Sequence, residues 1–272
     1  MKQLFLAALV SLVSGALYAQ DSAAVSQQVP QQNKKNAKRE RINNLLRMEE
    51  EGDLIFNKHS IFGIRLATDG YGINYEKGKF KTPTRTLLFE FELNEKKSPK
   101  EHKISSSADG FNYNSVVLYK LNNFYSFKMG IGQQYLIGGK GNKNGVAVTA
   151  LYAGGLSIGL LKPYYIQVED RNTQEITRST FPDLIKADSL GNLLVSGASG
   201  FTVGWSHLSI DPGVNVKTAM RFDYGRLNPT VSAIEVGLTG EFYANKVPLV
   251  MYVPQKQFFF NAYVSILFGS RK

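Results

Sequence analysis

The chain has 272 residues, no cysteine and a formal net charge of +10 at pH 7. Without cysteine there is neither a disulfide framework nor a lipidated cysteine behind a leader. Beyond the N-terminal leader, no stretch approaches the roughly 20 continuous apolar residues of a membrane-spanning helix. A membrane location would therefore require a closed β-barrel.

Residues 1–19 are predicted to form a cleaved secretory signal peptide. Lys2 gives a basic start, an apolar run extends from Leu4 to Leu17, and Ala19 is a small residue before Gln20. This order is typical of a signal cleaved after Ala19. An exported chain does not normally meet nucleic acid. We therefore expect the basic residues to contact phosphorylated lipids or an acidic cell-wall polymer, or else to pair with acidic residues in the lumen and lie on loops.

Residues 20–58 are predicted to form a periplasmic tether followed by a short amphipathic helix. Ile42, Leu45 and Leu46 have helical spacing, and Gly52 is a natural helix end. This helix could bind another envelope protein or lipid phosphates, or it could cover the periplasmic mouth of the barrel; both alternatives stay open. The residues predicted to bind a partner are Lys34, Lys35, Lys38, Arg39, Arg41, Ile42, Leu45 and Leu46.

Residues 59–272 alternate between apolar and polar side chains in one segment after another. Val214, Val216 and Met220, for example, interleave with Lys217 and Arg221. Alternation with period two indicates strands with one apolar face. A soluble sheet would bury that face, whereas a transmembrane barrel turns it to lipid and keeps the charges inside. Together with the signal peptide, the pattern predicts an all-β, antiparallel outer-membrane barrel.

The charged face of these strands is predicted to fill the barrel lumen with salt bridges. Side chains fill the interior of a barrel with few strands, so an open pore is not expected. The residues predicted to point inward are Arg65, Glu90, Glu92, Lys128, Lys217, Arg221, Asp223, Glu235 and Glu241.

We predict eight to ten strands and prefer ten, because single-chain bacterial barrels have an even number. Counting along these strands places the long insertion at 94–113 outside the cell and the insertion at 163–197 in the periplasm. The ten predicted strands are 61–68, 71–78, 84–93, 114–121, 124–134, 145–162, 198–209, 214–225, 231–243 and 257–269.

Two dipeptides predict tight hairpins within this series. Asp69-Gly70 has the chemistry of a two-residue type I′ turn and would pair Leu66 with Ile73. Asn122-Asn123 predicts a second hairpin, between the fourth and fifth strands of the series. Both turns would place the apolar side chains of paired strands on one face.

Chemistry-bearing motifs are few. The three histidines show no zinc spacing, and neither a cofactor nor a metal is expected. His207 and Ser209 would point the same way if they lay on one strand, with Asp211 as the supporting acid. This arrangement resembles the His-x-Ser site of outer-membrane lipid A deacylases. It makes a lipid A hydrolase an alternative function, with His207, Ser209 and Asp211 as the catalytic residues.

The chain resembles the small outer-membrane β-barrel proteins of the Bacteroidota. The resemblance covers nearly the whole mature chain and implies a barrel, and some relatives are accessory subunits of barrel-insertion or type IX secretion machinery. The motifs that carry it are Ala19-Gln20, Glu49-Glu50-Glu51-Gly52, Phe62-Gly63, Thr68-Asp69-Gly70-Tyr71-Gly72, Leu121-Asn122-Asn123-Phe124-Tyr125, Gly130-Ile131-Gly132-Gln133-Gln134 and the aromatic closing strand from Phe258 to Phe268.

The sequence therefore favours a non-enzymatic outer-membrane barrel that serves as an accessory or scaffold subunit of an envelope assembly or protein-secretion complex. Its expected partners are outer-membrane lipid, lipopolysaccharide and other envelope proteins. The lipid A hydrolase is one alternative, and a small-solute pore is another.

Overall fold

The computed structural model describes residues 36, 39–40, 43, 56–106, 114–140, 145–188, 191–225 and 229–272. The chain forms two compact units, Met1–Ile55 and Phe56–Lys272. Of the residues predicted to bind a partner, Arg39 is described and is exposed on a helix. No described helix is long and apolar enough to cross a membrane. The predicted signal peptide lies outside the described residues, as do Lys34, Lys35, Lys38, Arg41, Ile42, Leu45 and Leu46.

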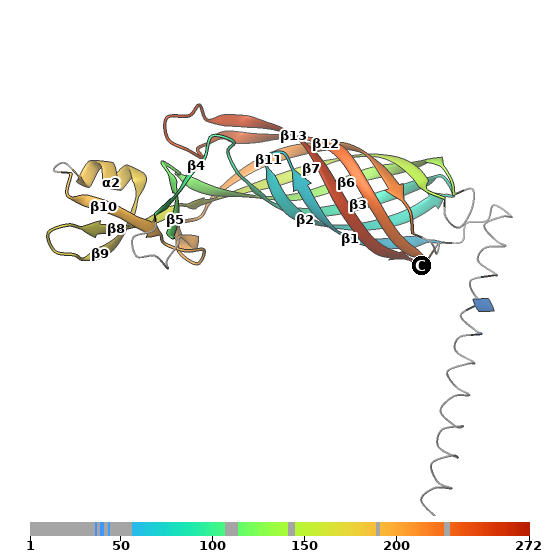
Figure 1. Cartoon of the computed structure of the whole chain (residues 1–272). Helices are drawn as coiled ribbons and strands as arrows, with labels where there is room; N and C mark the ends of the chain where they lie inside the picture. The colour runs from blue at the N-terminus through green and yellow to red at the C-terminus, as the bar shows by residue number, and fades with distance from the viewer. Residues whose placement is uncertain are drawn as a thin grey trace, which may run out of the picture. The chain divides into compact units, whose positions relative to one another are not determined.

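Eight antiparallel strands of the second unit close into a barrel, in the order β1-β13-β12-β11-β7-β6-β3-β2 (Figure 1). The first and last strands pair with each other from His59↔Arg271 to Ala67↔Tyr263, which closes the sheet. The barrel strands are β1 (Lys58–Ala67), β2 (Gly70–Thr82), β3 (Arg85–Lys96), β6 (Asn122–Gly138), β7 (Ala147–Pro163), β11 (Ser209–Asp223), β12 (Thr230–Val247) and β13 (Lys256–Arg271).

The all-β barrel predicted from the alternation is confirmed, and its eight strands lie within the predicted range. The preferred number of ten is not found, because two predicted strands are not barrel strands. The segment predicted at 114–121 contributes β5 (Asn114–Leu118), which pairs with β4 (His102–Ser106) in a separate two-stranded sheet. In the segment predicted at 198–209, residues Trp205–His207 form a 3₁₀ turn, η1.

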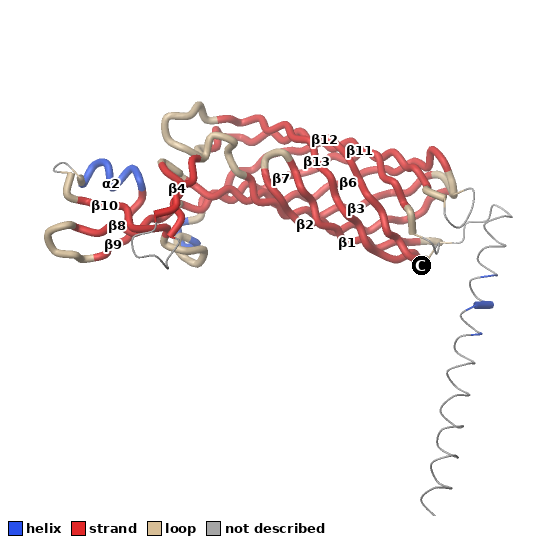
Figure 2. The backbone as a smooth tube through the Cα atoms, in the orientation of Figure 1, coloured by secondary structure: helices blue, strands red, loops and turns tan. Residues whose placement is uncertain are grey.

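The two long insertions contribute a small folded region, here called the head, whose described residues are 97–106, 114–121, 164–188 and 191–208. Besides β4 and β5 it contains β8 (Tyr165–Asp170), β9 (Ile176–Thr180), α2 (Phe181–Ala187) and β10 (Leu193–Ala198). Figure 2 shows these short strands and the helix beyond one end of the barrel. The prediction that the insertions lie on opposite sides is therefore wrong. The cause is that 114–121 is not a barrel strand, so the strands at 124–134 and 145–162 run opposite to the predicted direction. Because 198–209 is not a barrel strand either, the later strands keep their predicted direction.

The head has a hydrophobic core of its own. Val116, Ile166, Val168, Phe181 and Leu184 are buried against one another, and Met251 packs against them from the β12–β13 connection. Apolar burial of this kind is the main stabilising term for so small a region. The head is therefore an ordered extension of the barrel.

Local sequence explains why α2 begins at Phe181. The Thr180 side chain accepts a hydrogen bond from the Asp183 backbone N–H, and Pro182 stands in the first turn, where it costs no hydrogen bond. Phe181 and Leu184, three residues apart, share the buried face. Beside the helix, the Tyr164 hydroxyl accepts a hydrogen bond from the Val117 N–H at 3.2 Å, and burial raises the pKa of this phenol.

The first hairpin differs from its prediction in register. Thr68 and Asp69 form the turn, and Leu66 pairs with Tyr71 instead of Ile73. A shift by two residues keeps every side chain on its predicted face. The Asp69 carboxylate accepts hydrogen bonds from Lys96 and Asn261 of neighbouring strands, contacts that a local turn signal does not contain.

The second predicted hairpin is wrong. Asn122 lies inside β6, where it pairs with Pro163 of β7, and its side chain donates to the Pro248 carbonyl. Tyr119 adopts a positive φ of 56°, and Lys120 then bridges to Val250. The chain therefore crosses to the β12–β13 connection instead of folding back on itself.

Candidate functional site

The outer face of the barrel is mostly apolar, and on β2 the apolar series of Tyr71, Ile73 and Tyr75 gives way to exposed Lys77, Lys79 and Lys81. On β13, Val264, Ile266 and Phe268 are exposed, and between them Tyr263, Ser265 and Leu267 are buried. A continuous exposed apolar surface of this size is unfavourable in water and is the face that a bilayer covers. The lipid-facing residues were predicted in the correct phase because alternation alone fixes which side chains share a face.

The inner face is a network of ion pairs centred on Glu235. The Glu235 carboxylate lies 2.7 Å from Arg221, 3.6 Å from Lys217 and 3.7 Å from Arg65, and it accepts a hydrogen bond of 2.7 Å from the Tyr263 hydroxyl. Each of these side chains is almost completely buried. A buried charge is tolerated only when it is paired and hydrogen-bonded, and this site meets both conditions.

The network continues toward the head through Glu92 and Glu241. Glu92 lies 2.5 Å from Arg65 and 2.8 Å from Lys128, and Lys128 reaches Glu241 at 3.1 Å. At this end of the network, Lys96 lies 2.9 Å from Glu241. Ion pairs therefore connect residues from β1, β3, β6 and β12 across the lumen.

The network also reaches the opposite end of the barrel, where β1 begins at Lys58 and β13 ends at Arg271. Glu76 pairs with Arg221 at 2.5 Å and with His59 at 2.7 Å, and Asp223 pairs with Arg271. All the residues predicted to fill the lumen are buried, as the alternation indicated: Arg65, Glu90, Glu92, Lys128, Lys217, Arg221, Asp223, Glu235 and Glu241.

A lumen filled in this way leaves little free space. One void beside Arg65, Lys128 and Glu241 measures about 10 Å³, which is at the limit for a single water molecule. Around this void, ion-paired side chains occupy the lumen.

The predicted catalytic residues are not brought together. His207 ends the 3₁₀ turn, and its Nδ1 lies 3.0 Å from the Ser206 hydroxyl. Ser209 is the first residue of β11 and is exposed. Asp211 is buried and accepts hydrogen bonds from the backbone and side chain of Asn245. The premise that residues 207 and 209 share a strand is wrong, and the hydrogen bonds of the Asp211 carboxylate are made with Asn245.

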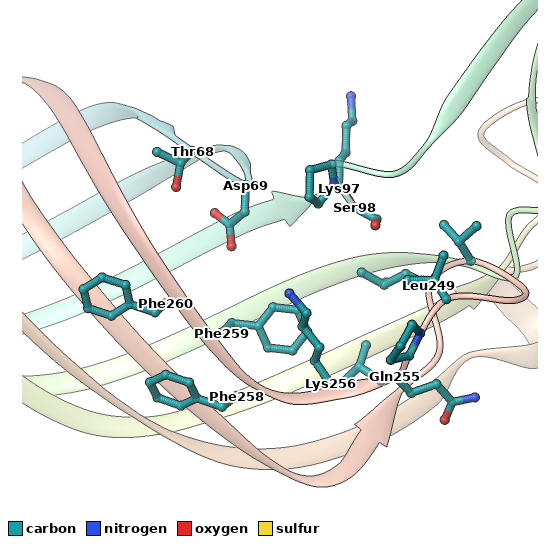
Figure 3. A pocket seen from close by; sticks show the side chains of 15 residues that line it. Thr68, Asp69, Lys97, Ser98, Leu249, Gln255, Lys256, Phe258, Phe259 and Phe260 are labelled. Carbon is teal, nitrogen blue, oxygen red and sulfur yellow. The ribbon is translucent and has the colours of Figure 1, made fainter.

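A pocket that sequence reasoning did not find lies at the rim of the barrel next to the head, and we call it the rim pocket (Figure 3). Its cavity volume is about 310 Å³. It is built from three segments far apart in the chain, 68–69, 97–99 and 247–260. Only the closure of the barrel brings these segments together, so no local motif could have indicated the pocket.

The rim pocket combines an apolar lining with a few polar groups. Phe258, Phe259 and Phe260 supply aromatic walls, and buried Val247 and Val250 contribute aliphatic ones. Mostly apolar pockets with a small number of placed polar groups are typical ligand sites.

The polar residues of the rim pocket are Thr68, Asp69, Lys97, Ser98, Gln255 and Lys256. The Asp69 carboxylate is already bound by Lys96 at 3.0 Å and is not free to act on a ligand. Among the described residues, no group of three histidine or acidic side chains could hold a metal ion. The chemistry that the rim pocket offers is therefore cationic and apolar.

Comparison with known proteins gives structural matches only. No protein-family model matches the chain, and no curated protein matches it significantly. Solved structures that resemble it include Neisserial surface protein A, with 9% identity, a TM-score of 0.36, and coverage of 79% of this chain and 96% of that one. Ail, the attachment invasion locus protein of Yersinia pestis, has 9% identity and a TM-score of 0.35, over 80% and 99%.

A third structure, the N-terminal β-barrel domain of Pseudomonas aeruginosa OprF, has 11% identity and a TM-score of 0.33, over 79% of this chain and 98% of that one. Similarity this low establishes neither the fold nor an activity of this chain. The assignment of the fold rests on the sheet topology: a closed, antiparallel barrel of eight strands with an apolar exterior and a charged interior.

Proposed function

We propose that this chain is a non-enzymatic outer-membrane protein, exported through a cleaved signal peptide, whose closed barrel is a scaffold for the head. In this role it is an accessory subunit of an envelope assembly or protein-secretion complex, as the resemblance to small barrels of the Bacteroidota suggests. The observation that carries the proposal is the pairing of an apolar exterior with a lumen filled by buried ion pairs.

The lengths of the connections support an orientation with the head outside the cell. At the end of the barrel that holds Lys58 and Arg271, β2 and β3 are joined by Pro83-Thr84 alone. At the other end, residues 97–106, 114–121, 164–188 and 191–208 form the head. Outer-membrane barrels have short periplasmic turns and longer external loops, so we propose that the end of the barrel holding Lys58 and Arg271 faces the periplasm.

Exposed apolar side chains on the head support a role in contacting another protein. On the head, Ile176 is 59% exposed, and Ile104 and Ile185 are also among the exposed large hydrophobic residues. In the neighbouring β12–β13 connection, Tyr252 is 82% exposed and meets Tyr119 of the head edge to face, with ring centroids 5.8 Å apart. Aromatic residues are enriched at the centres of protein interfaces, and these two rings form a small exposed aromatic patch where the head meets this connection.

Co-purification tests the scaffold role. We expect the tagged protein, extracted from native membranes in mild detergent, to retain an envelope protein in fixed stoichiometry. Tyr119→Ser with Tyr252→Ser should release a partner held by the head, whereas deletion of residues 20–52 should release one held by the periplasmic segment. The matched control is Lys103→Ser with Lys186→Ser, which changes two exposed, charged residues of the head. Isolation of the wild-type protein alone would contradict the scaffold proposal.

Conductance separates the scaffold from a pore. We expect the purified protein, inserted into planar bilayers, to give no stable single-channel current, because buried side chains occupy the lumen. Regular unitary currents from the wild-type protein would show that the lumen opens and would favour the pore instead.

A further inference from the structure

The rim pocket opens onto the face of the barrel that contacts lipid. Two of its walls, Phe258 and Phe260, are 57% and 63% exposed. They belong to the same outward-facing series on β13 as Val264 and Ile266. An apolar chain lying on the barrel surface can therefore reach the rim pocket without crossing a polar barrier.

The rim pocket also has an excess of available positive charge. Within the described part of the chain, Lys256 forms no ion pair. Lys97 forms one, 3.8 Å from Glu95, its side chain is 47% exposed, and its Nζ lies 4.9 Å from the centre of the Tyr71 ring. A pair this long at an exposed position contributes little. The one carboxylate lining the pocket, Asp69, is paired with Lys96, which also pairs with Glu241. An anion at this rim would meet Lys256, with Lys97 at the outer edge, where Figure 3 shows its side chain pointing away from Lys256.

The polar groups lie on opposite walls of the rim pocket. Figure 3 shows Lys97 and Ser98 at the end of β3 and Lys256 across from them at the start of β13. The Ser98 hydroxyl oxygen accepts a hydrogen bond from the Lys100 N–H at 3.3 Å, so its proton is available for a ligand. Ammonium groups and a hydroxyl donor match the acceptor oxygens of a phosphate.

We propose that the rim pocket binds the phosphate-bearing end of an outer-leaflet glycolipid, the lipid A part of lipopolysaccharide. Lys256 and Ser98 would hold the phosphate from opposite walls, Lys97 would add charge at the mouth, and an acyl chain would lie along Phe258 and Phe260. The volume of about 310 Å³ is at the lower end of ligand pockets, about 300–1,000 Å³, so it suits one end of a lipid. This inference rests on the proposed function, because it requires the head end to face outward.

Binding of purified lipid A to the detergent-solubilised protein, followed by native mass spectrometry, tests the proposal. We expect Lys97→Gln with Lys256→Gln to weaken binding by about tenfold or more, the usual effect of losing a charge-assisted contact. Val253→Trp should also weaken it, because Val253 lines the pocket and the larger side chain fills it while leaving both lysines. Lys103→Gln with Lys186→Gln removes the same charge from the head and should bind as the wild-type protein does.

Three results would overturn the proposal. The first is that the Lys97→Gln, Lys256→Gln variant binds lipid A as tightly as the wild-type protein does. The second is that lipid A without its phosphates binds as tightly as intact lipid A. The third is that inorganic phosphate at equal concentration displaces the lipid, which would indicate a site for the free anion. A heat-induced mobility shift on gels confirms that each variant has a folded barrel. Lipid binding is measured in detergent micelles, so a failure to bind lipid A would not depend on how the protein is oriented in cells. That orientation is tested separately by surface labelling.

Discussion

At the scale of single residues, Arg221 has the most demanding environment in the lumen. Its guanidinium lies 2.5 Å from Glu76 and 2.7 Å from Glu235, and it also donates to Gln134. All of these contacts are made inside a barrel whose outer face is apolar. Loss of this one cation would leave two carboxylates without their main partner, in a place where water cannot replace it.

We predict that Arg221→Met lowers the free energy of unfolding by about 3–5 kcal/mol, the usual cost of removing one partner of a buried pair. Reversible unfolding in urea, with the protein in lipid vesicles, measures this change. Arg178→Met, at an exposed position of β9, is the control and should change stability by about 0.5 kcal/mol or less. Neutralising the partners as well, with Glu76→Gln and Glu235→Gln, should recover part of the loss. No recovery would mean that Arg221 acts through packing instead of charge.

At the scale of elements, α2 shows how the head remains ordered outside the barrel. The helix has seven residues, too few for an isolated helix to be stable in water. It persists because Phe181 and Leu184 complete the core formed with Ile166 and Val168. The core clusters inside the barrel share no residue with this one, so the head should be able to loosen by itself.

We predict that Phe181→Ala destabilises the head by about 3–4 kcal/mol, since it leaves a cavity in a small core, while the barrel stays folded. Limited proteolysis should cut the head of this variant faster, with the heat-induced mobility shift of the barrel unchanged. Ile185→Ala, on the exposed side of the same helix, should be cut at the wild-type rate. Loss of the barrel shift in Phe181→Ala would show that head and barrel fold as one unit.

The elements also show how far sequence reasoning extends. All eight barrel strands and the orientation of their side chains follow from alternation, because a long strand with one lipid-facing side must repeat every two residues. The head strands were missed or misplaced, because five- and six-residue strands acquire their partners only from tertiary contacts. The alternation of apolar and polar residues predicted that Arg65 and Glu92 face inward. It did not predict that they pair with each other, because the register between strands decides which inward-facing residues meet. Lys256 and Ser98 were not predicted to share a site, because barrel closure alone brings them near each other.

At the scale of the whole molecule, the two ends of the barrel differ. One end carries short turns and the chain ends, and the other carries the head and the rim pocket. Each connection of an antiparallel barrel lies at the end opposite to the previous one. Once one loop is located inside or outside the cell, the side of every other loop follows.

We predict that this assignment can be read with single cysteines, because the chain has none of its own. Lys186→Cys, on the exposed face of α2, should react with a membrane-impermeant maleimide in intact cells. Thr84→Cys, in the short exposed β2–β3 turn, should react only after the outer membrane is permeabilised. The reverse pattern would place the head in the periplasm, and labelling of both in intact cells would show that the protein does not span the membrane in one orientation.

The length of β7 has a mechanical consequence. This strand pairs with β6 from Asn122↔Pro163 to Gly138↔Val148, pairs with β11 along its other edge, and leads through Tyr164 directly into β8 of the head. A pull on the head is therefore applied along the axis of β7, so two full hydrogen-bond ladders resist it in shear instead of opening one bond at a time. Under tension the head should unravel while the barrel holds, which makes the barrel an anchor and the head the part that gives way.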